Sequence, residues 1–209
     1  MDLSPSSRRI GFVYLAYFFA AFGSALAIKG ITVPGDPAAT TTNILAHDTA
    51  FRAGHAIDIA ANLIYITLAA LFYGYFRPVN RTLSLLAAFF ALVGCAVQLV
   101  SGLLQIAPLT LLPDNPAAAL IALKLHGQSF HISLVLFAMY DLIIGWLVLK
   151  SNVLPRALGI VLMVAGAGWF TFIWPPLASE LAPVVLPFGA LAEIALMLWL
   201  IVKNPEAPH

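Results

Sequence analysis

Charged side chains are scarce in this chain of 209 residues, where Asp, Glu, Lys and Arg together make up only 9%. Soluble domains carry roughly 25% charged residues. Hydrophobic residues make up 62% of the chain, and they are gathered into long uninterrupted runs. The scarcity of charge therefore excludes an ordinary soluble domain, and the apolar runs indicate an integral membrane protein.

The few charges nearly cancel, which leaves a formal net charge of +1. No strong overall field is available to attract nucleic acid, and we expect no nucleic-acid partner. Cysteine is also scarce, because Cys95 stands alone. An intramolecular disulfide, a CxxC pair and a CxxCH haem-attachment motif are therefore excluded, and we expect Cys95 to be a small buried hydrophobe.

Several catalytic motifs are missing as well. The chain has no GxSxG nucleophile elbow and no glycine-rich phosphate loop before a helix, so neither hydrolase-type nucleophilic catalysis nor nucleotide binding is predicted. It has no HExxH or HxxxH spacing, so a metal site is not predicted either. The sequence identifies no cofactor, and no motif fixes a function.

Six apolar segments are long enough to cross a bilayer, and turn-forming residues separate them. They cover about residues 10–29, 55–76, 83–107, 118–149, 154–174 and 184–202. We predict an all-α bundle of six transmembrane helices in a single domain, residues 1–209. The first segment is long for a cleaved signal peptide, so we expect it to be retained as a helix.

The connection between the first two spans is long and carries signals for a short external helix. Thr40, Thr41, Thr42 and Asn43 offer candidate N-caps, and we predict a helix from about Asn43 toward the second span. If that helix continues unbroken, Asp48 joins the polar face described below.

Basic residues near the span ends set the expected orientation. One side of the predicted bundle collects Arg8, Arg9, Arg77, Arg81, Lys150, Arg156 and Lys203. Because short cytoplasmic segments are enriched in Lys and Arg, we expect both termini to be cytoplasmic. The expected location is the bacterial cytoplasmic membrane.

The second span begins with five polar residues on one helical face. Spacings of three and four align Arg52, His55, Asp58, Asn62 and Tyr65. Charged and titratable groups on a membrane helix are costly, and they usually face a protein interior or a water-filled cavity. This stripe is therefore our first candidate site, although an ion pair that pins neighbouring helices together is an open alternative.

Two further spans carry polar faces. The third has Gln98, Ser101 and Gln105, and the fourth has Lys124, Gln128 and His131. Hydrogen bonds between helices explain the third face, and Lys124 can extend to the membrane surface. His131 lies deeper, and we favour it over His126, which points roughly the opposite way.

Acidic residues occur deeper in two spans. Glu193 is the lone acid near the middle of the last span, and it could partner Arg52, His55 or His131. Asp141 lies toward the cytoplasmic end of the fourth span, and we expect it to pair with a loop cation. With both termini inside, the polar faces share the outer half of the bilayer, where they could meet around one cavity with Glu193 as its floor.

Several short segments resemble a known family. They are Val33-Pro34-Gly35-Asp36, Asn43-Ile44, Phe51-Arg52, Arg77-Pro78-Val79-Asn80-Arg81 and Leu154-Pro155-Arg156. The resemblance is to bacterial multi-pass membrane proteins catalogued only as a domain of unknown function, and it extends over nearly the whole chain. It implies a compact helical membrane fold and no established chemistry.

The mixture of acids, bases and cations favours acid–base chemistry on a small lipophilic or amphiphilic substrate, such as isomerisation, cyclisation or hydrolysis. Candidate catalytic residues are Asp58, His55, Glu193 and His131. Candidate substrate-binding residues are Arg52, Asn62, Tyr65, Gln98, Gln105, Lys124 and Gln128. Open alternatives are ligand binding, transport, or haem held between His55 and His131. The expected partners are membrane lipids and a small lipophilic molecule.

Overall fold

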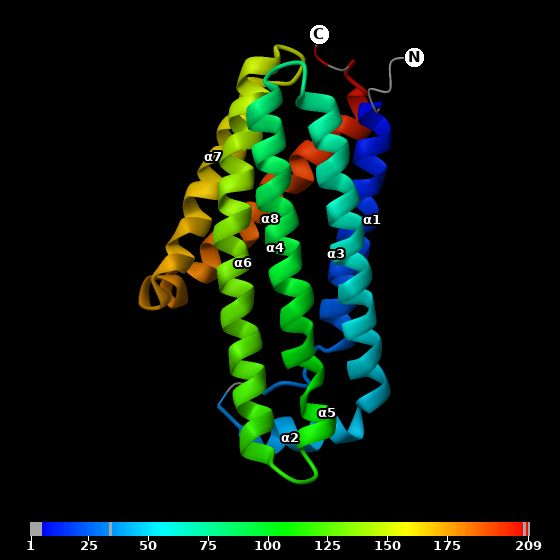
Figure 1. The fold of residues 1–209 in the computed structure, drawn as a ribbon, viewed down its shortest axis with the longest axis vertical. Helices are drawn as coiled ribbons and strands as arrows, with labels where there is room; N and C mark the ends of the chain where they lie inside the picture. Colours follow the sequence, from blue (N-terminus) through cyan, green and yellow to red (C-terminus); the bar gives the residue numbers. More distant parts are fainter. Residues whose placement is uncertain (1–5, 34, 207, 209) are drawn as a thin grey trace.

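The computed structural model describes residues 6–33, 35–206 and 208, and in this part of the chain it contains helices and no strand. Pro34, in the first turn of the resemblance, lies outside the described residues. Six helical segments are long and apolar enough to cross a membrane. They are α1 (Ser7–Ala27), α3 (Asp48–Phe76), α4 (Arg81–Ile106) with α5 (Pro108–Leu111), α6 (Pro116–Ser151), α7 (Arg156–Trp169) with the 3-10 helix η1 (Phe170–Ile173), and α8 (Pro175–Lys203) (Figure 1). The predicted all-α membrane bundle is confirmed.

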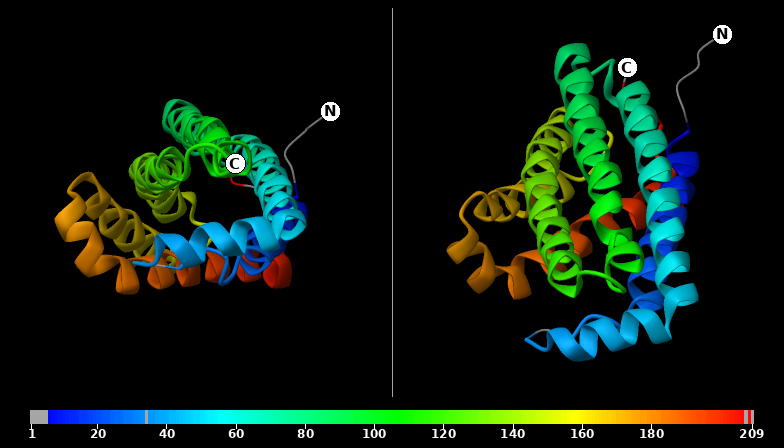
Figure 2. Two further views of the ribbon diagram at one scale, coloured as in Figure 1. Left: turned by 90° about the horizontal axis from the view of Figure 1, so that it is seen from below. Right: turned by 60° about the horizontal axis from the view of Figure 1, so that its bottom comes forward.

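The six spans form a closed ring in chain order. Each packs against the next, from α1 through α3, α4, α6 and α7 to α8, and α8 returns to pack against α1 (Figure 2, left). The start of α1, the end of α8 and the α3–α4 and α6–α7 turns lie at one end of the bundle, which we call the terminal end (Figure 1). The short helix α2 (Pro37–Ala46) lies crosswise at the opposite end (Figure 2).

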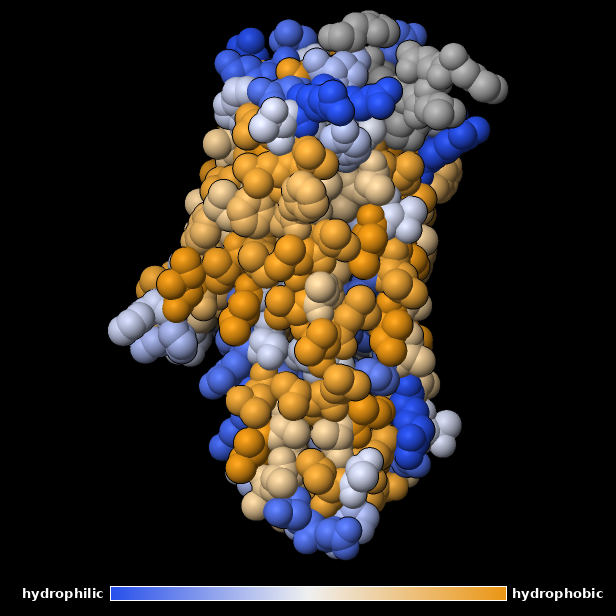
Figure 3. Space-filling view, viewed as in Figure 1, coloured by the Kyte–Doolittle hydropathy of each residue, from blue (hydrophilic) through white to orange (hydrophobic). Residues whose placement is uncertain are grey.

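The outer surface between the two ends is apolar. Figure 3 shows a broad hydrophobic band, with hydrophilic residues gathered at the terminal end. Phe19, Phe89 and Leu103 are among the large exposed side chains, whereas Tyr14 and Tyr65 are buried inside the ring. This distribution fits a bundle whose outer surface contacts lipid and whose polar aromatic side chains are kept inside.

The predicted start of the short helix at Asn43 is wrong, because α2 begins earlier, at Pro37. An Asp36 side-chain oxygen accepts a hydrogen bond from the Ala39 backbone N–H at 2.9 Å, and Pro37 occupies the first turn. Asp as N-cap followed by Pro is a strong start signal. The hydroxyls of Thr41 and Thr42 donate to carbonyls one turn back inside the helix, so they do not cap it.

Helix α2 does not continue unbroken into the second span, which was the condition for Asp48 to join the polar face. The chain leaves helical geometry at His47, whose φ is −118° and ψ is 34°, and α3 starts at Asp48. Asp48 therefore belongs to the first turn of α3, one turn before Arg52.

The last span begins at Pro175, earlier than the predicted start near residue 184, because α8 continues through Pro183 and Pro187. Proline removes a backbone donor, but membrane helices tolerate it where neighbouring groups satisfy the backbone. The indole N–H of Trp169 donates to the Val185 carbonyl at 3.3 Å in this part of α8.

Candidate functional site

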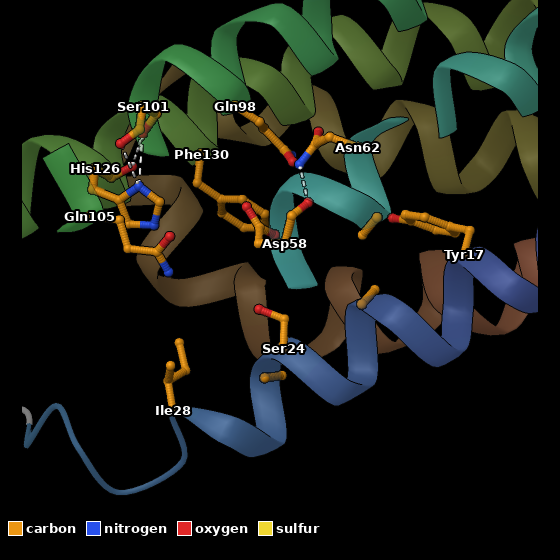
Figure 4. Close-up of a pocket in the computed structure, with 13 residues that line it drawn as sticks. Tyr17, Ser24, Ile28, Asp58, Asn62, Gln98, Ser101, Gln105, His126 and Phe130 are labelled. Carbon is orange, nitrogen blue, oxygen red and sulfur yellow. Dashed lines mark hydrogen bonds between the residues drawn. The ribbon is translucent and has the colours of Figure 1, made fainter. Parts of the chain in front are cut away.

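Polar side chains from α1, α3, α4 and α6 line a cavity of about 380 Å³ inside the ring, which we call the middle cavity (Figure 4). Its polar lining residues are Tyr17, Ser24, Asp58, Asn62, Gln98, Ser101, Gln105 and His126. The polar faces predicted on the second and third spans therefore meet around one space. Apolar residues of α1 and Phe130 complete the wall, so the cavity has both polar and apolar surfaces.

Two further chambers adjoin the middle cavity. An outer chamber of about 510 Å³ shares Ile28, Gln105 and His126 with it and is also lined by the α2 residues Pro37 and Thr40. An inner chamber of about 160 Å³ shares Tyr17, Gln98 and Phe130 with it and reaches Glu193. The three spaces run in sequence from the end that carries α2 to the interior of the bundle.

Hydrogen bonds between helices hold the cavity wall in place. His55 Nδ1 lies 3.0 Å from Gln105 Oε1 and joins α3 to α4. Ser101 Oγ lies 2.8 Å from His126 Nδ1 and joins α4 to α6. The second bond fixes the imidazole of His126 at the edge of the middle cavity (Figure 4).

Gln98 makes a similar link deeper in the wall. Its Nε2 donates to Ser133 Oγ at 2.9 Å, again from α4 to α6. The structural role expected for polar residues of the third span is thus present, and the same residues also line the cavity.

Asp58 is the acidic residue of the middle cavity. Its backbone carbonyl accepts a hydrogen bond from Asn62 Nδ2 at 3.0 Å, and its carboxyl lies within electrostatic range of His126 and His55 (Figure 4). In the described part of the chain, the carboxyl has no ion pair with Lys or Arg. A carboxyl beside two imidazoles is suited to proton transfer.

Glu193 borders the inner chamber, and its side chain is only 4% exposed. The Tyr14 phenol lies within electrostatic range of the Glu193 carboxyl. Tyr65, from the predicted stripe, lines the same chamber and packs edge-on against Phe137 and Tyr140. Glu193 therefore lies at the floor of the connected spaces, and the neighbour it meets is a phenol instead of Arg52, His55 or His131.

His55, Tyr65 and Glu193 do not line the middle cavity itself, and four more predicted site residues lie away from it. Arg52 pairs with Asp48 on the outside of α3 at 2.6 Å, and Gln128 is exposed. His131 packs against Phe172 of η1, with ring centroids 4.9 Å apart. Lys124 lines only the outer chamber. Their roles in binding or catalysis stay predictions.

His55 and His131 have different neighbours, and haem held between them stays a prediction. His55 lies against Gly102 and Gln105 of α4, whereas His131 faces η1. Within the described residues, no three His, Cys, Asp or Glu side chains form a group able to hold a metal ion.

His126 is the cavity residue that sequence reasoning set aside. The inward face of α6 runs through His126, Phe130, Ser133 and Phe137 at spacings of four, three and four. That periodicity was available in the sequence, but the stripe of Lys124, Gln128 and His131 matched it equally well. Packing against α4 decides which face turns inward.

The predicted pairing of Asp141 with a loop cation is wrong. The residue is only 1% exposed and has no ion pair among the described residues. Of the six spans, α6 is the most enclosed, because it packs against both α4 and α7. A residue near its terminal end therefore faces the protein interior instead of a loop.

A closed ring of six apolar helices around polar chambers defines an α-helical, multi-pass integral membrane protein. The chain belongs to the family described as "Domain of unknown function (DUF4386)", whose model matches residues 10–204. It is 26% identical over 144 residues to an uncharacterized protein of the archaeon Archaeoglobus fulgidus, a match that covers 68% of this chain and 78% of the relative. No solved structure matches the chain. The predicted family is confirmed, and the relative shows that similar chains occur in archaea.

Proposed function

We propose that the middle cavity binds a small lipophilic or amphiphilic molecule and that Asp58 and His126 carry out acid–base chemistry on it. The observation that carries this proposal is the presence of a carboxyl, an imidazole and several amides in one cavity with apolar walls. Apolar pockets with a few convergent polar groups are typical of small-molecule sites. His55 lies close enough to influence Asp58 electrostatically and is the second candidate base.

The chemistry of each residue in the middle cavity suggests its role in the proposed reaction. A carboxylate and an imidazole accept and return protons, while the amides of Asn62, Gln98 and Gln105 offer both donors and acceptors to a polar headgroup. Ile28 and Phe130 offer apolar contact to the rest of the molecule. Glu193, at the floor, is the residue that a long substrate would reach last.

We further propose that the terminal end faces the cytoplasm of a prokaryotic cell. Arg8, Arg77, Arg81, Arg156 and Lys203 all belong to helix ends or turns there, as expected for cytoplasmic segments. The outer chamber then opens on the external side, and substrates enter from there or from the outer leaflet.

Access to the cavity is tested with single cysteines in a Cys95→Ala background. Ala21→Cys and Ala25→Cys line the middle cavity, whereas Ala91→Cys is fully buried on α4 and is the matched control. A membrane-impermeant thiol reagent applied outside intact cells should label the first two and spare the third. Labelling only from the cytoplasmic side would overturn the orientation, and no labelling from either side would overturn the open cavity.

Chemistry is tested by incubating nanodisc-embedded protein with a total lipid extract in D₂O, followed by chromatography and mass spectrometry. Acid–base catalysis at carbon should yield a deuterated or altered product that Asp58→Asn and His126→Gln fail to form. His47→Gln, an exposed histidine outside the cavity, should behave as wild type. A lipid that co-purifies and is released unchanged would instead favour ligand binding without catalysis.

A further inference from the structure

Beyond the middle cavity, the bundle contains a second polar cluster that the proposed chemistry does not require. Asp141 on α6 and Glu193 on α8 are 1% and 4% exposed, and the two carboxyls lie within electrostatic range of each other. Two buried carboxyl groups that have no ion-pair partner among the described residues cannot both remain charged without a large cost.

Among the residues that the structure describes, no Lys or Arg forms an ion pair with either acid. In the described part of the chain, the one ion pair joins Arg52 and Asp48, which are far along α3 from the cluster and largely exposed. The groups that face the acids come from three elements and are neutral types at neutral pH: Tyr14 and Tyr17 from α1, Tyr65 from α3, and Tyr140 beside Asp141 on α6.

The remaining packed elements add no cation either. Cys95 of α4 lies within electrostatic range of Tyr140 and Tyr17, and α7 contributes Gly166, at which a β-carbon would lie 3.1 Å from Asp141 Cβ. Trp169 of α7 lines the inner chamber beside Glu193. Every packed helix therefore offers the acids an apolar or uncharged surface.

Two buried atoms of the cluster have unused hydrogen-bonding capacity. Within the described residues, Asp141 Oδ2 and the Tyr140 hydroxyl have no hydrogen-bond partner. Buried polar groups are almost always paired, and an unpaired one calls for an explanation. A proton on one carboxyl converts it from a pure acceptor into a donor, and it removes one of two adjacent negative charges.

The cluster also has a connection to the outside. Glu193 borders the inner chamber, and that chamber shares Tyr17, Gln98 and Phe130 with the middle cavity. The middle cavity in turn joins the outer chamber at Gln105 and His126. On the other side of the pair, Asp141 is enclosed between α6 and α7.

We propose that Asp141 and Glu193 form a proton-binding site that holds at least one proton at neutral pH and exchanges it through the chambers on the α2 side. Asp141 lies on α6 and Glu193 on α8, and both helices pack against α7, so a change in the charge of either acid alters the packing around α7. This inference does not depend on which molecule the middle cavity binds, because neither Asp141 nor Glu193 lines that cavity.

Infrared difference spectroscopy of the full chain in liposomes tests the site directly. At neutral pH, the wild-type protein should show the carbonyl band of a protonated carboxyl, and this band should shift in D₂O. The band should be lost in the double variant Asp141→Asn, Glu193→Gln, and it should persist in Asp114→Asn, Glu180→Gln, whose side chains are exposed on the surface. Absence of the band from the wild-type protein, or its survival in the buried double variant, would overturn the proposal.

A second measurement on wild-type protein guards against misfolding of the double variant. The chain contains only three glutamates and six aspartates. Carbon-13 labelling of their carboxyls should move the band, which identifies it as a carboxyl band without any substitution. A thermal shift series in NaCl, KCl and choline chloride at equal ionic strength completes the test. Stabilisation specific to Na⁺ in wild type, and lost in the buried double variant, would replace the proton with a metal cation.

Discussion

Gly145 of α6 and Gly159 of α7 face each other so closely that a β-carbon built on either residue would lie 2.6 Å from the carbonyl oxygen of the other. Small residues let membrane helices approach at backbone distance, where packing replaces the hydrophobic effect as the source of association. About two turns further along the same pair of helices, Gly166 of α7 lies against the Ala138 carbonyl of α6. This contact line brings α7 against the side of α6 that carries Asp141.

Gly145→Ala is therefore expected to weaken the α6–α7 contact and to destabilise the protein by about 1–3 kcal/mol, the usual cost of overpacking. Gly127→Ala, on the same helix, meets no atom within 4 Å and is expected to be neutral or slightly stabilising. Thermal unfolding in one detergent compares the two. Equal melting temperatures would contradict the close contact.

Ser101→Ala removes the hydroxyl that lies 2.8 Å from His126 Nδ1. A typical hydrogen bond of this kind contributes about 0.5–1.5 kcal/mol, so a modest loss of stability is expected. The sharper readout is the ¹⁵N NMR spectrum of histidine-labelled protein, in which the His126 Nδ1 signal should shift because the Ser101 backbone carbonyl, 3.2 Å away, is then its remaining partner on α4. Ser129→Ala removes a hydroxyl that bonds only within α6, and it should leave that signal unchanged.

Arg52→Gln is expected to cost no more than about 0.5 kcal/mol, because exposed ion pairs one helical turn apart contribute little. The Arg52 and Asp48 side chains are 59% and 47% exposed. Gln105→Leu, which removes the partner of His55, should cost more, since it leaves a half-buried imidazole nitrogen unpaired. Chemical unfolding measures both, and a larger loss in Arg52→Gln would place that residue in the site after all.

Much of the fold could be predicted from hydropathy, because a bilayer requires long apolar segments and each span must satisfy its own backbone. The residues at which the helices begin and end were harder to predict. The start of α2 depends on the Asp36 cap, and α8 continues through Pro183 because α7 packs beside it. At these helix ends, N-cap candidates and prolines give conflicting local signals, and tertiary packing determines which residue begins the helix.

The site was only partly predictable for a related reason. Periodicity places Asp58 and Asn62 on one face of α3, and both line the middle cavity. It cannot set the rotation of α6, which turns His126 inward and His131 toward η1. Both faces of α6 carry a histidine, so the choice between them depends on contacts between helices.

Cys95 was expected to be a buried hydrophobe, and it is 0% exposed. We predict that lipid-soluble maleimide fails to label the native protein and labels it fully after denaturation. Val100→Cys in a Cys95→Ala background lies on the same helix, but its native side chain is 67% exposed toward the lipid, so the introduced thiol should react in the native state. The labelled fraction by mass spectrometry compares the two. Rapid labelling of native Cys95 would mean that α4 separates from α6 on the time scale of the reaction. The buried control Ala91→Cys lies on the same helix, so the cysteine experiments on the middle cavity would then lose their basis.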